Sequence, residues 1–211
     1  MITLILPIAG GSFRFPNTRP KFLLTHPLGN TLLTESIRGL PLKKIDKIVI
    51  IGLKEHQVKY RYIKDLKKEL YEVYGILGNK LEFVLLKNKT KNQPETIVKG
   101  IEDLKISGQI LIKDCDNYFE TNDIQGNFVS VYSLNNLKSV NASNKSYIKF
   151  GKKGEVVNIV EKSIIGDKFC CGLYGFSEAS NFLDSYYFLK KYDDLYVSHI
   201  IYHRILKVPY K

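Results

Sequence analysis

The hydrophobic residues in the first half of the chain follow two alternating patterns. Short continuous apolar runs, typical of strands buried on both faces, are separated by segments in which apolar residues recur every three or four positions, as on one face of a helix. The runs cover residues 2–8, 47–52, 81–86 and 109–113, and the helical segments cover residues 31–40, 54–74 and a stretch that begins at Pro94. This alternation predicts a parallel sheet with helices on both of its faces.

The second half of the chain has a different pattern. Two apolar segments, residues 146–150 and 155–160, flank a Gly-Lys-Lys-Gly turn, which predicts an antiparallel hairpin. We expect another strand over residues 168–176 and helices over residues 178–190 and 195–207. Neither a repeat nor a low-complexity linker interrupts the sequence, so we expect one domain over residues 1–211. The predicted fold is a Rossmann-like mixed α/β sheet, parallel in its N-terminal half, to which the C-terminal half adds antiparallel strands and helices.

Composition and charge narrow the class of protein and partner. Hydrophobic residues make up 44% and charged residues 25% of the chain, as in folded globular proteins, and no apolar run is long enough to span a membrane. The first residues are apolar without a basic segment, so we expect a first strand rather than a secretory signal, and a cytoplasmic location. The net charge of +11 favours anionic partners. Because the basic residues are mostly scattered lysines, we interpret them as a solvated surface rather than a nucleic-acid footprint.

A loop of small residues follows the first strand. It begins with Ala9, Gly10, Gly11 and Ser12. Small residues let the backbone approach a ligand and point its N–H groups at an anion. Arg14 and Lys21, a little further on, supply a guanidinium and an ammonium group that suit phosphate. The loop matches neither a Walker motif nor Gly-x-Gly-x-x-Gly. We expect it to bind phosphate at the carboxyl edge of the sheet, where ligands of parallel sheets bind.

A second polar segment, Asp114-Cys115-Asp116-Asn117, ends the strand at residues 109–113. Carboxylate oxygens are the hard ligands that Mg²⁺ bound to a nucleotide phosphate requires. The commonest role of such residues after a strand is a turn or a helix cap. Their pairing with the basic loop at the same edge of the sheet favours a metal site.

The first loop resembles the signature of the sugar-phosphate nucleotidyltransferases, Ala-Gly-x-Gly-x-Arg followed by Lys-Pro-Lys. The matching residues are Ala9, Gly10, Arg14, Pro20 and Lys21, while Ser12 replaces the second glycine and Arg19 the first lysine. The resemblance implies a GT-A-type fold, nucleotide binding by the loop from Ala9 to Ser12, and catalytic roles for Arg14 and Lys21. The change at Ser12 adds a Cβ atom close to the phosphates and puts turnover, more than fold, in question.

The resemblance also implies a metal site. Asp116 takes the place of the family's metal-binding aspartate, so we expect it to hold Mg²⁺. The family commonly supplies a second carboxylate from near its C-terminus, which is not recognisable here. Four residues are candidates for that role: Asp184, Asp193, Asp194 and Asp114, of which we select Asp114.

Two further segments resemble family motifs. Gln93-Pro94-Glu95-Thr96 is similar to the segment beside the nucleotide base, which implies nucleotide binding by Gln93, Glu95 and Thr96; a plain helix N-terminus is the alternative interpretation. Glu161-Lys162, followed by Gly172-Leu173-Tyr174-Gly175-Phe176, resembles the acceptor-binding pair, with Ser163 in place of a proline. Glu161 and Lys162 are therefore expected to bind the acceptor, the lysine through its phosphate.

Aromatic residues near the end of the chain suggest another site. Tyr186, Tyr187, Phe188, Tyr192 and Tyr196 could form a cage for a quaternary ammonium group, although aromatics at helical spacing are more often core residues. The sequence leaves both interpretations open.

The expected function is that of a Mg²⁺-dependent nucleotidyltransferase. It would transfer NMP from an NTP, with CTP, UTP or dTTP favoured, to a phosphorylated acceptor such as a sugar 1-phosphate or phosphocholine, and release pyrophosphate. The resemblance implies capsule or lipopolysaccharide synthesis. From the lack of a long apolar run we expect no membrane partner, and a homo-oligomer is compatible with the sequence. The alternatives are a GT-A glycosyltransferase that uses Asp114-x-Asp116 as its metal motif, and a degenerate member that binds nucleotide or nucleic acid without catalysis.

Overall fold

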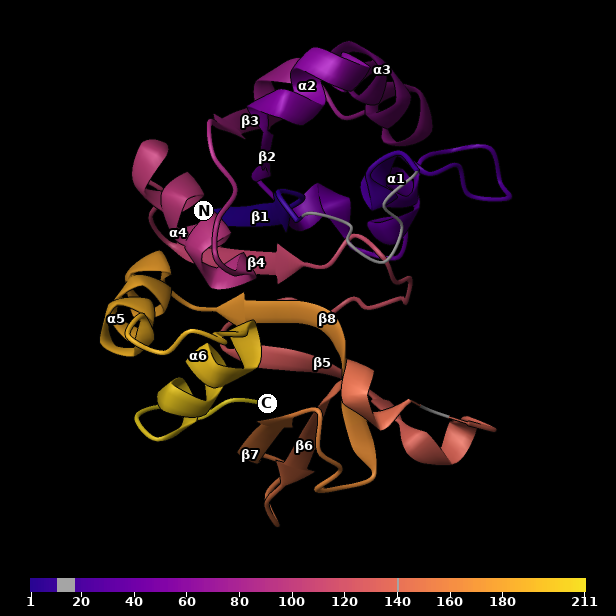
Figure 1. Ribbon diagram of the computed structural model, residues 1–211. Coiled ribbons are helices and arrows are strands. Elements are labelled where there is room, and N and C mark those ends of the chain that lie inside the picture. Colours follow the sequence, from indigo (N-terminus) through magenta and orange to yellow (C-terminus); the bar gives the residue numbers. More distant parts are fainter. Residues whose placement is uncertain (11–17, 140) are drawn as a thin grey trace.

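The computed structural model describes residues 1–10, 18–139 and 141–211, and within them the strands form one sheet of eight (Figure 1). The strands are β1 (Ile2–Pro7), β2 (Lys47–Leu53), β3 (Leu81–Leu86), β4 (Gln109–Lys113), β5 (Phe128–Ser133), β6 (Ser146–Phe150), β7 (Val156–Glu161) and β8 (Lys168–Phe176). Their order is β3-β2-β1-β4-β8-β6-β7, and β5 pairs with β8 beside this path.

The sheet changes direction between β4 and β8. Strands β3, β2, β1 and β4 are parallel, whereas β8 pairs antiparallel with β4, β5 and β6. The hairpin of β6 and β7 is antiparallel as well. The sequence prediction of a mixed α/β fold, parallel in its first half, is therefore confirmed.

Six α-helices of the described chain cover this sheet. They are α1 (Leu32–Ser36), α2 (Lys54–Tyr60), α3 (Tyr62–Tyr74), α4 (Gln93–Asp103), α5 (Ala179–Leu189) and α6 (Val197–Ile205). Two short 3-10 helices, η1 (Lys21–Leu23) and η5 (Ala142–Asn144), lie beside the carboxyl edge of the sheet. No helix of the described chain is both long and apolar enough to cross a bilayer.

Three details differ from the predicted elements. The single helix expected over residues 54–74 is two helices, because Arg61 adopts a left-handed conformation with φ of 50° between α2 and α3. The first helix ends at Ser36 rather than at residue 40. Strand β5 was not predicted, because its alternating residues lie between polar loops without a clear turn signal.

The core lies on both faces of the sheet. On β1 and β2, successive side chains point to opposite faces. Ile5 and Val49 belong to the cluster that packs against α4, α5 and α6, whereas Leu4 and Ile48 belong to the cluster that packs against α1 and α3. Because both faces are covered, the central strands are apolar along their whole length.

Gly39 lies where the chain leaving α1 passes the segment that follows β4. Its carbonyl oxygen accepts a hydrogen bond from the backbone N–H of Thr121 at 3.0 Å. A Cβ atom at residue 39 would lie 2.0 Å from the carbonyl oxygen of Phe119 and 2.9 Å from the Cα atom of Glu120. Since both obstacles are backbone, a side chain here has to displace the segment.

We therefore expect Gly39→Ala to lower the free energy of unfolding by about 1–3 kcal/mol, the usual cost of overpacking. Gly78→Ala is the matched control, because an added Cβ atom there meets nothing within 4 Å. Urea unfolding of the two variants measures the difference, and equal midpoints would contradict the proposed clash.

Glu35 is a buried carboxylate on α1. Arg38 binds both of its oxygens, with Nε 2.6 Å from Oε2 and an Nη2 atom 2.7 Å from Oε1, and Asn30 donates to Oε1 at 2.6 Å. The hydrogen bond from Arg38 is the main cause that lowers the pKa of Glu35 below its usual value of 4.5, against the opposing effect of burial.

A lowered pKa in the folded state means that ionised Glu35 stabilises the fold at neutral pH. This contribution should be lost as the pH falls below 4.5 and through the folded-state pKa. The difference in free energy of unfolding between the wild type and Glu35→Gln should therefore shrink between about pH 6 and about pH 3. Urea titrations across this range measure it, and a difference that stays constant would refute the assignment.

Candidate active site

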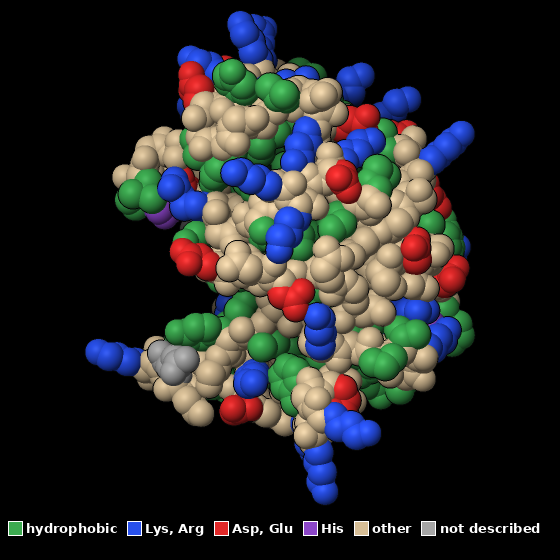
Figure 2. Space-filling view, turned by 180° about the vertical axis from the view of Figure 1, so that it is seen from behind, with side chains coloured by type: hydrophobic (Ala, Val, Ile, Leu, Met, Phe, Trp, Pro, Cys, Tyr) green, Lys and Arg blue, Asp and Glu red, His purple; other side chains and the backbone are tan. Residues whose placement is uncertain are grey.

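Three cavities meet at the carboxyl ends of β1 and β4, and Asp116 lines all of them. Figure 2 shows the molecule deeply hollowed on one side, the side toward which the arrowheads of β1 and β4 point in Figure 1. Lysine and arginine side chains are scattered over the visible face instead of gathering in one patch (Figure 2). The polar segment after β4 is thus the centre of the hollow.

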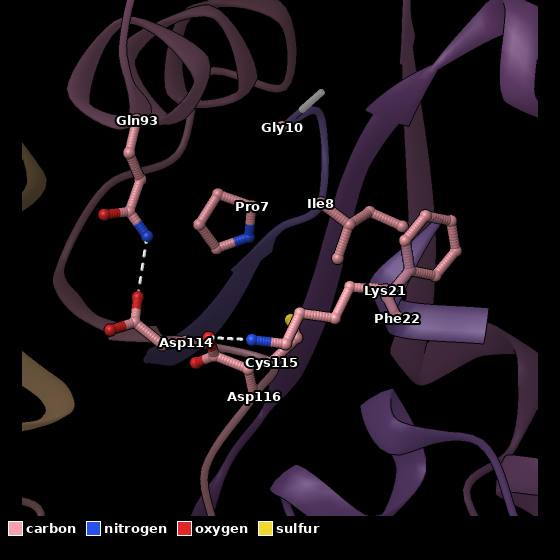
Figure 3. A pocket seen from close by; sticks show the side chains of 9 residues that line it. All are labelled: Pro7, Ile8, Gly10, Lys21, Phe22, Gln93, Asp114, Cys115 and Asp116. Carbon is pink, nitrogen blue, oxygen red and sulfur yellow. Dashed lines mark hydrogen bonds and ion pairs between the residues drawn. The ribbon is translucent and has the colours of Figure 1, made fainter. Parts of the chain in front are cut away.

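The first cavity, of about 350 Å³, brings the predicted nucleotide-binding segments together (Figure 3). Its lining residues are Pro7, Ile8, Gly10, Lys21, Phe22, Gln93, Asp114, Cys115 and Asp116. They come from the end of β1, from η1, from the start of α4 and from the end of β4. Gly11, Ser12 and Arg14 lie outside the described residues, and Ala9 is buried next to Gly10.

An ion pair joins the two predicted motifs across the first cavity. The Nζ atom of Lys21 lies 2.7 Å from Oδ2 of Asp116, and about a third of each side chain is exposed (Figure 3). Burial acts to raise the pKa of the Asp116 carboxyl. The hydrogen bond from Lys21 and the positive charges of Lys21, Lys113 and Lys145 outweigh this effect and lower the pKa below its usual value. Asp116 is therefore an ionised group facing a cavity.

Asp114 lies beside Asp116 in a drier environment. Desolvation raises the pKa of Asp114 to about 6, although Nε2 of Gln93 donates a hydrogen bond to its Oδ1 at 2.7 Å. Its backbone N–H donates to the carbonyl oxygen of Gly172 on β8 at 2.8 Å. Gly172 has a φ of +81°, and a Cβ atom there would lie 2.5 Å from Oδ2 of Asp114. Residue 172 therefore has to be glycine for the Asp114 carboxylate to occupy its position.

Lys113, at the end of β4, is a residue of the site that the sequence did not reveal. Its side chain is fully buried, and its ammonium donates to the carbonyl oxygens of Asp114 at 2.6 Å and of Asn117 at 3.1 Å, and to Oδ1 of Asn117. It also lies 5.1 Å from the ring centroid of Phe119. Burial lowers the pKa of Lys113. Its contacts hold the loop that presents the two aspartates.

The second cavity, of about 410 Å³, lies between α1 and the loop after β4. Its lining residues are His26, Leu28, Leu32, Glu35, Ser36, Arg38, Cys115, Asp116, Asn117 and Tyr118. The Glu35–Arg38 pair forms part of its wall. This cavity adds a partly apolar recess next to Asp116.

The third cavity, of about 180 Å³, is mostly polar and lies on the β8 side of Asp116. Its lining residues are Gln93, Asp114, Asp116, Asn117, Asn144, Lys145, Ser146, Glu161, Cys170, Gly172, Tyr174, Tyr196, Val197 and Ser198. The first and third cavities share Gln93, Asp114 and Asp116, so ligands in both would meet at the two carboxylates. Sequence reasoning missed Lys145 and Ser198 here, because no local motif marks them, and it singled out Tyr196 only as a member of a possible aromatic cage.

The two predicted acceptor-binding residues differ in position. Glu161 lines the third cavity, and its Oε2 accepts hydrogen bonds from the hydroxyls of Ser146, at 2.5 Å, and Ser198, at 2.7 Å. Lys162 is exposed and does not line the cavity, and its Nζ atom donates to the hydroxyl of Tyr196 at 2.7 Å. The structure places the carboxylate in the site and the ammonium outside it.

Two predicted base-binding residues have local roles at the start of α4. Oε2 of Glu95 accepts a hydrogen bond from the backbone N–H of Lys91 at 2.7 Å, and Thr96 is buried with its Oγ1 2.5 Å from that of Thr90. Neither lines any of the three cavities. Gln93 is therefore the one residue of the three expected beside the base that lines the site in the described chain. Glu95 and Thr96 instead belong to a plain helix N-terminus, the alternative interpretation of this segment.

Of the two interpretations of the late aromatic residues, the cage does not form in the described chain. Tyr196 lines the third cavity, whereas Tyr187 donates a hydrogen bond to Glu102 on α4, and Phe188 stacks on His203 with ring centroids 4.7 Å apart. Tyr187 and Phe188 are therefore engaged with partners other than Tyr196.

Asp114 and Asp116 are the carboxylates that line both the first and the third cavity in the described chain. The other three candidates for the second ligand, Asp184, Asp193 and Asp194, line none of the three cavities. Within the described ranges no group of three or more His, Cys, Asp or Glu side chains could hold a metal ion. Two carboxylates suit Mg²⁺, which usually binds one or two of them and completes its shell with substrate phosphates and water.

No protein-family model matches the sequence, and no curated protein matches it. Several solved structures match the fold. A nucleoside-diphosphate-sugar pyrophosphorylase from Vibrio cholerae RC9 has a TM-score of 0.77 and 22% identity, over 98% of this chain and 89% of that one. An inositol-1-phosphate CTP transferase from T. maritima has a TM-score of 0.71 and 14% identity, over 100% of this chain and 83% of that one.

A UDP-glucose pyrophosphorylase in complex with UDP-glucose has a TM-score of 0.72 and 15% identity, over 99% of this chain and 89% of that one. At sequence identities of 14–22%, the similarity to these structures shows that the fold is shared, and it shows nothing further. The chain therefore has the Rossmann-like mixed α/β fold of these nucleotidyltransferases, and the fold class expected from its sequence is confirmed.

Proposed function

We propose that the protein is a Mg²⁺-dependent nucleotidyltransferase that transfers NMP from an NTP to a phosphorylated acceptor and releases pyrophosphate. The observation that carries the proposal is the ion pair between Lys21 and Asp116, 95 residues apart in sequence, at 2.7 Å in the first cavity. It unites the small-residue loop after β1 with the acidic loop after β4. The names of the solved structures that share the fold support the same chemistry.

The two cavities that share Asp114 and Asp116 divide the substrates between them. The triphosphate lies in the first cavity, near Gly10 and Lys21, and the acceptor lies in the third. An oxygen of the acceptor phosphate attacks the α-phosphorus, the bond from that phosphorus to the bridging oxygen breaks, and pyrophosphate leaves with the electron pair. Because the acceptor phosphate is already an anion, positioning and charge neutralisation supply the catalysis without a strong base.

Asp114 and Asp116 would hold Mg²⁺, which neutralises phosphate charge when bound. Lys21 binds Asp116 in the structure and is close enough to contact the phosphates when a nucleotide enters. Lys113 keeps both aspartates in place through the loop contacts described above. A lysine point charge on a flexible stem suits a group that changes partners.

We propose that the donor is a pyrimidine nucleotide: CTP, UTP or dTTP. We also propose that the reaction takes place in the cytoplasm. In support, the solved structures of the same fold include a CTP transferase and a protein that holds UDP-glucose. No observation on the described residues favours the glycosyltransferase or the non-catalytic alternative. A pyrophosphate-release screen tests the proposal directly. It pairs ATP, GTP, CTP, UTP and dTTP with sugar 1-phosphates, inositol 1-phosphate and phosphocholine, and no release from any pair would refute the proposal.

Asp116→Asn should reduce pyrophosphate release by at least about 100-fold, because the amide removes the charge that holds the cation at the reacting phosphate. Asp123→Asn is the matched control, since this exposed aspartate contacts Lys211 and the backbone N–H of Gln125 and lies outside the three cavities. Turnover is measured with the best substrate pair from the screen. A fully active Asp116→Asn variant would refute the assignment of Asp116 as a metal ligand.

Removal of divalent cations should abolish turnover. Protein and substrates treated with EDTA are expected to release no pyrophosphate, because two carboxylates and a triphosphate would then repel one another. Added Mg²⁺ in excess of the chelator should restore the rate. Activity that persists in EDTA would show that Lys21 and the backbone suffice without a metal ion.

A further inference from the structure

Lys145 is a cation inside the third cavity. It directly follows η5 at the start of β6, is half-buried, and lines the cavity together with Asp114, Asp116 and Glu161. Its Nζ atom lies 5.2 Å from the ring centroid of Phe169.

Lys145 is also the only lysine or arginine that lines the third cavity within the described chain. Three carboxylates line the same space, and Glu161 would still repel an entering phosphate when Mg²⁺ compensates Asp114 and Asp116. Glu161 is occupied by two serine hydroxyls. Lys145 therefore carries the positive charge that an anionic acceptor needs on this side of Asp116.

Lys162 is placed differently although it is the backbone neighbour of Lys145. Its N–H donates to the carbonyl oxygen of Lys145 at 2.8 Å, just beyond the paired residues Ser146 and Glu161. Lys162 has a φ of 60°, so the chain leaves the extended geometry of β7 there. Its ammonium contacts the hydroxyl of Tyr196 from the exposed side. Lys145 therefore lines the cavity, whereas Lys162 lies behind Tyr196, a residue of the cavity wall.

We propose that Lys145, and not Lys162, binds the acceptor phosphate, and that Lys162 acts only as a positioning residue for Tyr196. The proposal rests on the proposed function. The ligand is a phosphate monoester with a small polar body, since the cavity measures about 180 Å³ and the amides of Asn117 and Asn144 line it. The amides and the Ser198 hydroxyl can donate to or accept from hydroxyl groups of that body.

The test compares three matched charge removals: Lys145→Gln, Lys162→Gln and Lys152→Gln. Glutamine keeps most of the aliphatic stem and removes the ammonium that lies over the Phe169 ring. Lys152 lies in the exposed turn between β6 and β7 and lines none of the three cavities. With the best pair from the screen, Lys145→Gln should raise the KM for the acceptor at least about tenfold, the value of one charge-assisted hydrogen bond. The KM for the NTP should change less than about twofold in all three variants, and Lys145→Arg should recover most of the acceptor affinity.

A second measurement does not need turnover. Inorganic phosphate is titrated into isotope-labelled protein while the backbone amide signal of Ser146, next to Lys145, is followed by NMR. The signal should shift saturably in the wild type, in Lys162→Gln and in Lys152→Gln, and it should not respond in Lys145→Gln. Unaltered spectra elsewhere in the Lys145→Gln protein would show that it is folded.

The outcomes separate the two proposals. If no substrate pair releases pyrophosphate but phosphate moves Ser146 only when Lys145 is present, the proposed function fails and the anion site stands. If pyrophosphate is released but Lys162→Gln, and not Lys145→Gln, raises the acceptor KM, the function stands and the inference on Lys145 is overturned. A phosphate response that is equal in all variants overturns it as well.

Discussion

The buried ammonium of Lys113 is the constraint on which the candidate site depends. A charge that is fully removed from water has to be surrounded by acceptors, since leaving it without partners would cost several kcal/mol. The acceptors here are two carbonyl oxygens and an amide oxygen of the loop from Asp114 to Asn117. By taking these partners, Lys113 bends the loop back over the end of β4. The two aspartates are then presented on its outer side, where the cavities meet.

The change of strand direction next to β4 gives the site its two sides. On one side, parallel β1 ends at the small-residue loop and Lys21 follows, and on the other side antiparallel β8 passes Gly172 close to Asp114. A parallel neighbour in place of β8 would have brought a further crossover connection to this edge. The antiparallel strand instead leaves room for β6, β7 and α6 to form the walls of the third cavity. Two different ligands can therefore reach the same pair of carboxylates from opposite directions.

Much of this architecture could be predicted from the sequence, because periodicity and turn chemistry are local. The buried strands, the hairpin and the position of Lys21 and Asp116 at one edge of the sheet all follow from patterns that short segments carry, whereas the direct ion pair between these two residues was not predicted. The placement of Arg14, Gly11 and Ser12 stays a prediction. The break at Arg61 depends on a single left-handed residue that has no glycine or proline to announce it.

The remaining site residues depend on tertiary contacts that no short segment encodes. A lysine at the end of an apolar strand usually lies in water, and only the loop that folds back makes Lys113 a buried group. Lys145 and Ser198 come from segments without a motif and meet Glu161 only because β6, β7 and α6 pack together. Glu95 and Thr96 illustrate the opposite case, since a motif-like segment turned out to satisfy its own helix terminus.

The ion pair of Lys21 and Asp116 has a consequence for the order in which ligands are accepted. A free cation approaching Asp116 has to compete with the ammonium, and a free polyphosphate approaching Lys21 has to compete with the carboxylate. A ligand that brings both charges together replaces both partners at once and leaves neither of them uncompensated. By thermodynamic linkage, each half of such a ligand then increases the affinity for the other half. Under the proposed function, this would make the resting site selective for the metal–nucleotide complex over either of its separate components.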